Sequence, residues 1–212
     1  MTADPGRAQE GSATPWIERR THSTPASAIT EVQNAREMAI PIALLKTDHR
    51  KVEELFERFE SAKGAAKKQA VARQICTELT VHATIEEEIF YPACKGKVED
   101  DLLNEGYVEH DGAKVLIAEI EAGTPDEQFY DSKVKVLSEQ IEHHVGEEER
   151  PSTGIFSQAR AAGLDMEALG ARLAARKKEL TAQFATAGVP APETRTFTGA
   201  EMDRGAPVGK AH

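Results

Sequence analysis

Apolar residues recur at helical spacing through the middle of the chain. Between residues 40 and 184 they fall three or four positions apart, which is the period of one face of an α-helix. Almost no segment shows the strict alternation of a half-buried strand. The pattern predicts helices over five stretches, namely residues 40–62, 65–91, 100–121, 124–150 and about 165–184.

Prolines and glycines suggest where these helices begin and end. Thr124, Pro125 and Glu127 are the residue types of an N-cap, N1 and N3 position, so the fourth helix is expected to start at Thr124. Pro92 is expected to stop or kink the second helix, because its ring clashes with the carbonyl four residues back. Residues 151–156 read as a small insertion after the fourth helix.

The short connections between these helices predict antiparallel neighbours. The expected fold class is all-α: an antiparallel up-down-up-down four-helix bundle over residues 39–150 with an extra C-terminal helix, together forming one domain at 37–186. Glycine, proline, serine and threonine crowd both ends of the chain. Disordered tails are therefore expected at 1–36, apart from a candidate short helix near 29–37, and at 187–212.

The second and fourth predicted helices carry the same pattern of apolar and polar residues. In each, two apolar residues are followed on the same helix face by a histidine and, one turn later, by a glutamate. Burying such a polar pair without a partner costs several kcal/mol, so the two pairs are expected to share a metal site. The two sets are Ile75, Leu79, His82, Glu86 and Leu137, Ile141, His144, Glu148.

A further histidine lies upstream of each pair. His49 lies on the apolar face of the first predicted helix, and His110 on that of the third. The chain is thus two copies of one hairpin, whose first helix carries a single inward histidine. Gly106 and Gly112 flank His110, and glycine inside a helix costs about 1 kcal/mol relative to alanine, so we expect them to permit close packing or bending beside the site.

The inward polar residues form one candidate metal-binding set. Four imidazoles and two carboxylates exceed the needs of one tetrahedral zinc and suit two metal ions, with the two glutamates able to bridge. Imidazole and carboxylate donors without thiolate favour iron, followed by manganese or zinc. The predicted ligands are His49, His82, Glu86, His110, His144 and Glu148.

Several neighbouring residues leave alternatives open. His143 has a glutamate at the same spacing as His144, although the apolar stripe favours His144. Asp48 and Glu109 either orient the neighbouring histidines or lie on the helix surface. Tyr91, Tyr107 and Tyr130 are candidate redox or hydrogen-bonding groups near the site; Tyr107 is the best placed of the three, but packing is its expected role. The remaining acids are expected to face solvent or to support ligands; they are Glu87, Glu88, Glu147 and Glu149.

Four sequence blocks carry a resemblance to a known family. They are LKTDHR at 45–50, HATIEEEIFYP at 82–92, EHD at 109–111 and EHHVGEEE at 142–149. Over residues 39–150 the chain resembles hemerythrin-like proteins of the HHE cation-binding domain family. The resemblance implies a four-helix bundle with a non-haem di-iron centre that meets dioxygen, nitric oxide or peroxide. Oxygen carriers of this family place a histidine where this chain has Lys114, so reversible oxygen carriage is not expected.

Composition narrows the remaining function classes. A net charge of −10 argues against nucleic-acid binding, and the apolar runs are too short to span a membrane. Cys76 and Cys94 fit free thiols in a reducing cytosol, so a cytoplasmic location is expected. We expect a hemerythrin-like protein that reacts with or senses oxygen, peroxide or nitric oxide in a stress or iron and oxygen response. A peroxidase-like or catalase-like di-iron enzyme and a structural zinc bundle are the alternatives, and the sequence does not decide whether the protein is an enzyme.

Overall fold

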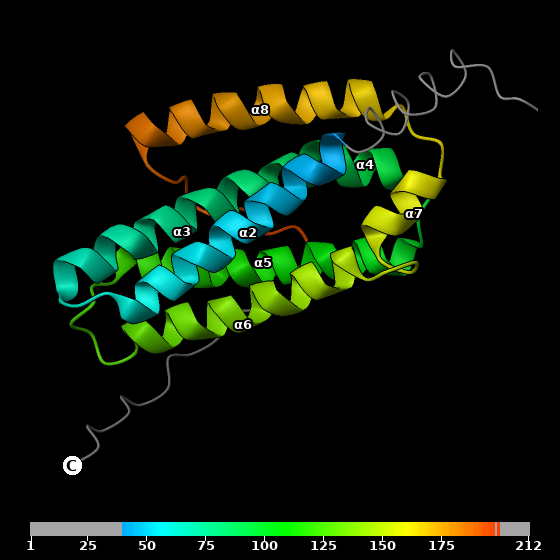
Figure 1. The fold of residues 1–212 in the computed structure, drawn as a ribbon. Helices are drawn as coiled ribbons and strands as arrows, with labels where there is room; N and C mark the ends of the chain where they lie inside the picture. Colours follow the sequence, from blue (N-terminus) through cyan, green and yellow to red (C-terminus); the bar gives the residue numbers. More distant parts are fainter. Residues whose placement is uncertain (1–39, 198, 200–212) are drawn as a thin grey trace, which may run out of the picture.

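The computed structural model describes residues 40–197 and residue 199. The expected N-terminal tail at 1–36, the candidate helix near 29–37 and the end of the expected C-terminal tail lie outside the described residues. Within the described part the chain is all-helical and contains no strand (Figure 1). The elements are α2 (Ile40–Ser61), α3 (Ala65–Ile85), η1 (Glu86–Phe90), α4 (Tyr91–Cys94), α5 (Asp100–Ala122), α6 (Tyr130–Glu149), α7 (Ile155–Ala161) and α8 (Met166–Ala187).

The helices pack as neighbours in the order that the chain suggests. α2 packs on α3, α3 packs on α5, and α5 packs on α6. α8 lies along α2 and α3, on the side away from α5 and α6 (Figure 1). Among the described residues, no helix is both long enough and apolar enough to cross a membrane.

The apolar core falls into two clusters with a polar layer between them. Leu45 and Leu103 belong to the first cluster, and Val52 and Ala113 belong to the second. His49 and His110 fall between these residues on α2 and α5, and His82 falls at the corresponding boundary on α3. The histidines therefore form a buried polar layer between two apolar regions.

The second predicted helix does not stop at Pro92, although its regular α-helical pattern is interrupted just before that residue. α3 passes directly into η1, a five-residue π-helix, in which the Tyr91 N–H donates to the carbonyl of Glu86. α4 follows, and Pro92 lies in its first turn, where the missing N–H costs little. A single π-turn inside a helix is often found at a functional site, and this one begins at a predicted metal ligand.

The predicted start of the fourth helix is wrong by about one and a half turns. Residues 124–129 form turns, and α6 begins at Tyr130. The expected interaction does form, because a Glu127 carboxylate oxygen accepts a hydrogen bond from the Thr124 N–H at 2.9 Å. The next backbone bonds run three residues back, from Glu127 to Thr124 and from Tyr130 to Glu127, so the capping residues close turns here instead of opening a helix.

Residues 151–156, which the sequence suggested as a small insertion, lead into the short helix α7. Ile155 and Phe156 are buried in the first core cluster. Gly154 permits the sharp return from α6, because a Cβ atom there would lie 2.6 Å from the backbone oxygens of Glu147 and Glu148. α7 therefore packs tightly against the end of α6 and brings Phe156 to the polar layer.

Candidate metal centre

The structure brings all six predicted ligands together in the polar layer. The four histidines come from four different helices, α2, α3, α5 and α6, and all six residues are buried. Their ligand atoms form two groups that share Glu86, with the atoms of each group within 4.8 Å of one another. One group is His49, His82, Glu86 and Glu148, and the other is Glu86, His110 and His144.

The histidines are arranged in two pairs. The Nε2 atoms of His49 and His82 lie 3.0 Å apart. Those of His110 and His144 lie 3.2 Å apart. Each pair therefore presents two nitrogen donors towards one point, and the chain provides two such points.

Each buried glutamate reaches both histidine pairs. Oε2 of Glu86 lies 3.2 Å from Nε2 of His82 and 3.4 Å from Nε2 of His110. On the other side of the centre, Oε2 of Glu148 lies 3.4 Å from Nε2 of His49 and 3.7 Å from Nε2 of His144. Both carboxylates thus lie between the two pairs, which is the position of a bridging ligand.

Each of the four histidines has a carboxylate group near its Nδ1 atom. In each case it faces Nδ1, the ring nitrogen turned away from the centre, and so favours a proton on Nδ1 and a free lone pair on Nε2. The distances from Nδ1 to the carboxylate oxygen are 2.8 Å for His49 and Glu149, 3.5 Å for His82 and Asp48, 3.2 Å for His110 and Glu87, and 2.6 Å for His144 and Glu109.

The donor set fits a bound cation. Both carboxylate oxygens of Glu86 and Oε2 of Glu148 are buried without a hydrogen-bond partner among the described residues. Leaving a buried carboxylate oxygen unpaired is costly, and a metal ion between the histidine pairs removes that cost. Imidazole and carboxylate donors without thiolate are a chemistry that iron, manganese and zinc accept.

The charges at the centre are mutually dependent. Burial alone would lower the pKa of the His82 imidazole, but Glu86 and Asp48 raise it to about 10. Glu86 and Glu87 likewise raise the pKa of His110 to about 9. Burial would raise the pKa of Glu86, yet His82 and His110 hold it well below its usual range. A metal ion must therefore compete with protons for the histidine nitrogens.

The structure separates the acids that flank the predicted ligands. Glu87 and Glu149 support histidines through Nδ1, whereas Glu88 is exposed and pairs with Arg176 at 2.7 Å. Glu147 pairs with the neighbouring Arg150. His143 lies outside the centre: its side chain is 62% exposed, and its Nε2 lies 3.5 Å from Glu109.

Of the three tyrosines that the sequence suggested near the site, Tyr91 is the one whose hydroxyl reaches a predicted ligand. Its buried hydroxyl donates to Oε1 of Glu148 at 2.9 Å, and its ring stacks on His110 with centroids 5.5 Å apart. Tyr107, for which the sequence favoured a packing role, packs edge-on against the Tyr91 ring. Gly106 makes room for this tyrosine, because a Cβ there would lie 2.8 Å from the Tyr91 hydroxyl oxygen. The π-turn at Glu86–Phe90 brings the Tyr91 side chain to the centre, because it changes which residues share the helix face of Glu86. Pro92 was the sequence signal that the regular helix is interrupted here.

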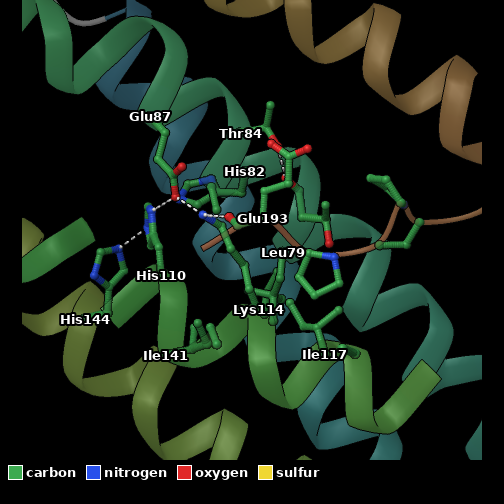
Figure 2. Close-up of a pocket in the computed structure, with 18 of the residues that line it drawn as sticks. Leu79, His82, Thr84, Glu87, His110, Lys114, Ile117, Ile141, His144 and Glu193 are labelled. Atoms are coloured by element: carbon green, nitrogen blue, oxygen red, sulfur yellow. Dashed lines mark hydrogen bonds and ion pairs between the residues drawn. The ribbon is translucent and has the colours of Figure 1, made fainter. Parts of the chain in front are cut away.

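A cavity of about 550 Å³ lies beside the centre, and all four histidines contribute to its lining. Figure 2 shows His110 and His144 at one end of it, with Lys114 and Glu87 beside them. The ammonium group of Lys114 lies 2.7 Å from Glu87 and 3.1 Å from Asp111. It is therefore engaged with two carboxylates and does not act as a donor to a metal.

Comparison with known proteins gives three likenesses. The sequence model of the family described as Hemerythrin HHE cation binding domain matches residues 40–151. A protein from Nostoc sp. named DNA nickase is 31% identical over 123 residues, which are 58% of this chain and 35% of that protein. The chain therefore spans about a third of the length of this relative.

A solved structure shows that the fold is also similar. The crystal structure of a hemerythrin HHE cation binding domain-containing protein from Mycobacterium kansasii aligns with a TM-score of 0.58. The alignment covers 69% of this chain and 93% of that chain at 22% identity. At this identity the likeness concerns the helical fold alone.

Proposed function

The chain belongs to the hemerythrin HHE cation-binding family, and we propose that it holds a non-haem di-iron centre that reacts with or senses oxygen, peroxide or nitric oxide. The observation that carries the proposal is the position of Glu86 and Glu148 between two histidine pairs. The proposal includes an antiparallel up-down-up-down arrangement of α2, α3, α5 and α6, which their short connections and neighbouring contacts support.

Two ions suit this donor set better than one. His49 and His82 would hold one ion, His110 and His144 the other, and the two glutamates would contact both. A single tetrahedral zinc would leave at least two of the six buried donors unused. Among two-ion choices, mixed nitrogen and oxygen donors without sulfur favour iron, with manganese and zinc less suited.

Bound iron would supply electrons and open coordination positions for a small oxidant. The residues of the chain hold that site in place. Tyr91 fixes the carboxylate of Glu148 through its hydroxyl. Phe156 stacks on His49 with ring centroids 5.7 Å apart and keeps water from that side. Lys114 stands where oxygen carriers of the family have a further histidine, and its ammonium group pairs with Glu87 and Asp111. Reversible oxygen carriage is therefore not part of the proposal.

A peroxidase-like or catalase-like enzyme is the second candidate, favoured by the buried hydroxyl of Tyr91. Burial and the charges of Glu148 and Glu86 raise the pKa of Tyr91 well above its usual value, so the hydroxyl keeps its proton. A neutral hydroxyl held at Glu148 would be a hydrogen-bond donor beside bound peroxide. Sustained consumption of hydrogen peroxide by the iron-loaded protein would favour this enzyme over a sensor.

The proposal does not extend DNA nicking to this chain. The chain spans 35% of the Nostoc protein that carries that name. Its net charge is −10, whereas phosphate-backbone binding depends on lysine and arginine charge.

Elemental analysis of the anaerobically purified full chain tests the proposal. We expect about two metal ions per chain, mainly iron. One tightly bound zinc and no iron would contradict the di-iron centre and leave a structural zinc bundle as the better description.

A further inference from the structure

The cavity beside the metal centre is larger than the proposed small ligands require. Its volume is about 550 Å³. A water molecule occupies about 30 Å³ of the liquid, and pockets for organic ligands measure roughly 300–1,000 Å³. Oxygen, nitric oxide or peroxide would therefore fill only a small part of it, and its size matches an organic molecule.

The cavity is an elongated slot along one face of α5. The α5 residues that line it recur at spacings of three and four, from His110 through Ala113, Ile117 and Ala118 to Glu121 and Ala122. At 1.5 Å of rise per residue, this lining extends for about 18 Å along the helix. One end of the slot is thus at the histidines, and the other is near the end of α5.

Apolar side chains from several elements form the walls of the slot. They include Val52 of α2, Leu79 and Ala83 of α3, Ile141 of α6, and Val189 and Pro190, which follow α8. Figure 2 shows Leu79, Ile117 and Ile141 around the slot. A ligand with an apolar body would be desolvated on several sides.

The chain after α8 closes the outer side of the slot. Oδ2 of Asp111 accepts hydrogen bonds from the backbone N–H groups of Arg195 and Thr196 at 2.7 and 2.6 Å. The Thr196 hydroxyl donates to the same oxygen at 2.8 Å, and Lys114 donates to the carbonyl of Glu193. Residues 189–195, expected from the sequence as part of a disordered tail, are therefore fastened to the helix that forms the inner wall.

The cations in the lining are already paired. Lys114 contacts Glu87 and Asp111, and the Arg195 guanidinium lies 3.4 Å from Glu87. At the far end, Oε1 of Glu121 is buried without a hydrogen-bond partner among the described residues. The thiol of Cys76, a weak donor, interacts with this carboxylate. Away from the metal centre, the slot thus offers no free cation to an anionic head group, and it offers an acceptor to a hydroxyl.

We propose that this slot binds an elongated, uncharged organic molecule with an apolar body and a hydroxyl head group near Glu121. The apolar body would lie between α3 and α5 under residues 189–195, with its far end towards the histidines. Binding depends on the walls of the slot, so the inference goes beyond the proposed reaction with small oxidants.

Fluorescence titration of the full-length, metal-loaded chain with N-phenyl-1-naphthylamine tests this site. We expect saturable binding of one probe per chain. 1-Decanol should displace the probe at a concentration about tenfold or more below that of decanoate, because the Glu121 end of the slot accepts a hydroxyl and repels a carboxylate. Failure of the probe to saturate, or equal displacement by decanoate, would overturn the proposal.

A pair of variants on α5 locates the bound probe. Ala118→Phe places a ring in the slot and should weaken probe binding about tenfold or more. Val115→Phe is the matched control, because Val115 is 43% exposed and does not line the slot. Equal affinity of both variants for the probe would place the probe elsewhere and contradict the assignment.

A second variant tests the same site if Ala118→Phe fails to fold. Ala83→Leu narrows the facing wall on α3 and should also weaken binding, with folding of both variants followed by circular dichroism. Metal content is measured on the same samples. Probe binding without iron would refute only the di-iron proposal, whereas iron without probe binding would refute only the organic-ligand site.

Discussion

The hydroxyl of Tyr91 donates a 2.9 Å hydrogen bond to Oε1 of Glu148, across the boundary between the π-turn region and the end of α6. Both side chains are almost fully buried. The other carboxylate oxygen of Glu148 faces His49 and His144. A single tyrosine therefore fixes the rotation of a carboxylate that two histidines from different helices share.

Tyr91→Phe should lower the free energy of unfolding by about 1.5–3 kcal/mol, the range for a hydrogen bond to a charged group, because Oε1 of Glu148 loses its donor. Urea denaturation of the metal-loaded protein measures the change. Tyr107→Phe is the control, since Tyr107 contacts the Tyr91 ring by its own ring. Equal destabilisation by the two variants would show that the hydroxyl of Tyr91 has no special role.

Glu86→Gln should greatly reduce bound metal, because an amide is a poor substitute for a carboxylate between two histidine pairs. Thermal stability should fall with it, since a bound metal stabilises the folded state. Glu88→Gln is the matched control on the same segment, because Glu88 is exposed and paired with Arg176. Full metal content in Glu86→Gln, measured by elemental analysis, would exclude Glu86 as a ligand.

His144→Ala should lose iron, and His143→Ala should retain it. His144 is buried with Nε2 at 3.2 Å from that of His110, whereas His143 is mostly exposed. The two variants remove the same side chain from adjacent positions, so their general effect on α6 is matched. The opposite pattern of iron content would reverse the assignment.

Metal removal should leave a protein whose stability falls as pH rises. The pKa of His82 is raised from 6.5 to about 10 and that of His110 from 6.5 to about 9. Protonation of these imidazoles in the folded state therefore contributes stability that is fully present below about pH 6.5 and lost as pH rises through about 9 to 10. Metal binding should follow the opposite trend and release protons.

Thermal melts of chelator-treated protein between about pH 6 and 10 measure this dependence, and a His82→Gln variant should flatten it. Calorimetry of metal binding in buffers of different ionisation enthalpy measures the protons released. A metal-free protein whose stability stays constant across this range would contradict the raised pKa values.

The reduced, iron-loaded protein should react with oxygen or peroxide without storing oxygen reversibly. Lys114 occupies the position where oxygen carriers of the family place a histidine, and its ammonium group is held by Glu87 and Asp111. A protonated amine has no lone pair for a metal. Stopped-flow spectra after mixing with oxygen follow the reaction. A coloured form that is discharged by removing oxygen and restored by adding it would place the protein among carriers.

Helical periodicity in the sequence is sufficient to group four of the six candidate ligands in two pairs. Residues seven and eleven positions after Ile75 or Leu137 share a helix face, so His82, Glu86, His144 and Glu148 follow from local geometry. The same periodicity places His143 on a different face. The extents of α2, α5 and α8 also follow from local pattern to within a few residues.

Only the tertiary structure decided what surrounds those ligands. The pairing of Glu109 with His144, of Tyr91 with Glu148 and of Glu149 with His49 joins residues on different helices. Tertiary packing also decided three features of the backbone. These are the turn that replaces the predicted start of α6, the π-turn at Glu86, and the closure of the slot by residues 189–195. Local sequence determines the helix face on which a side chain lies, because the period of an α-helix is fixed by hydrogen bonds between residues four positions apart. It does not determine the register between helices, which is set by packing among residues far apart in the chain.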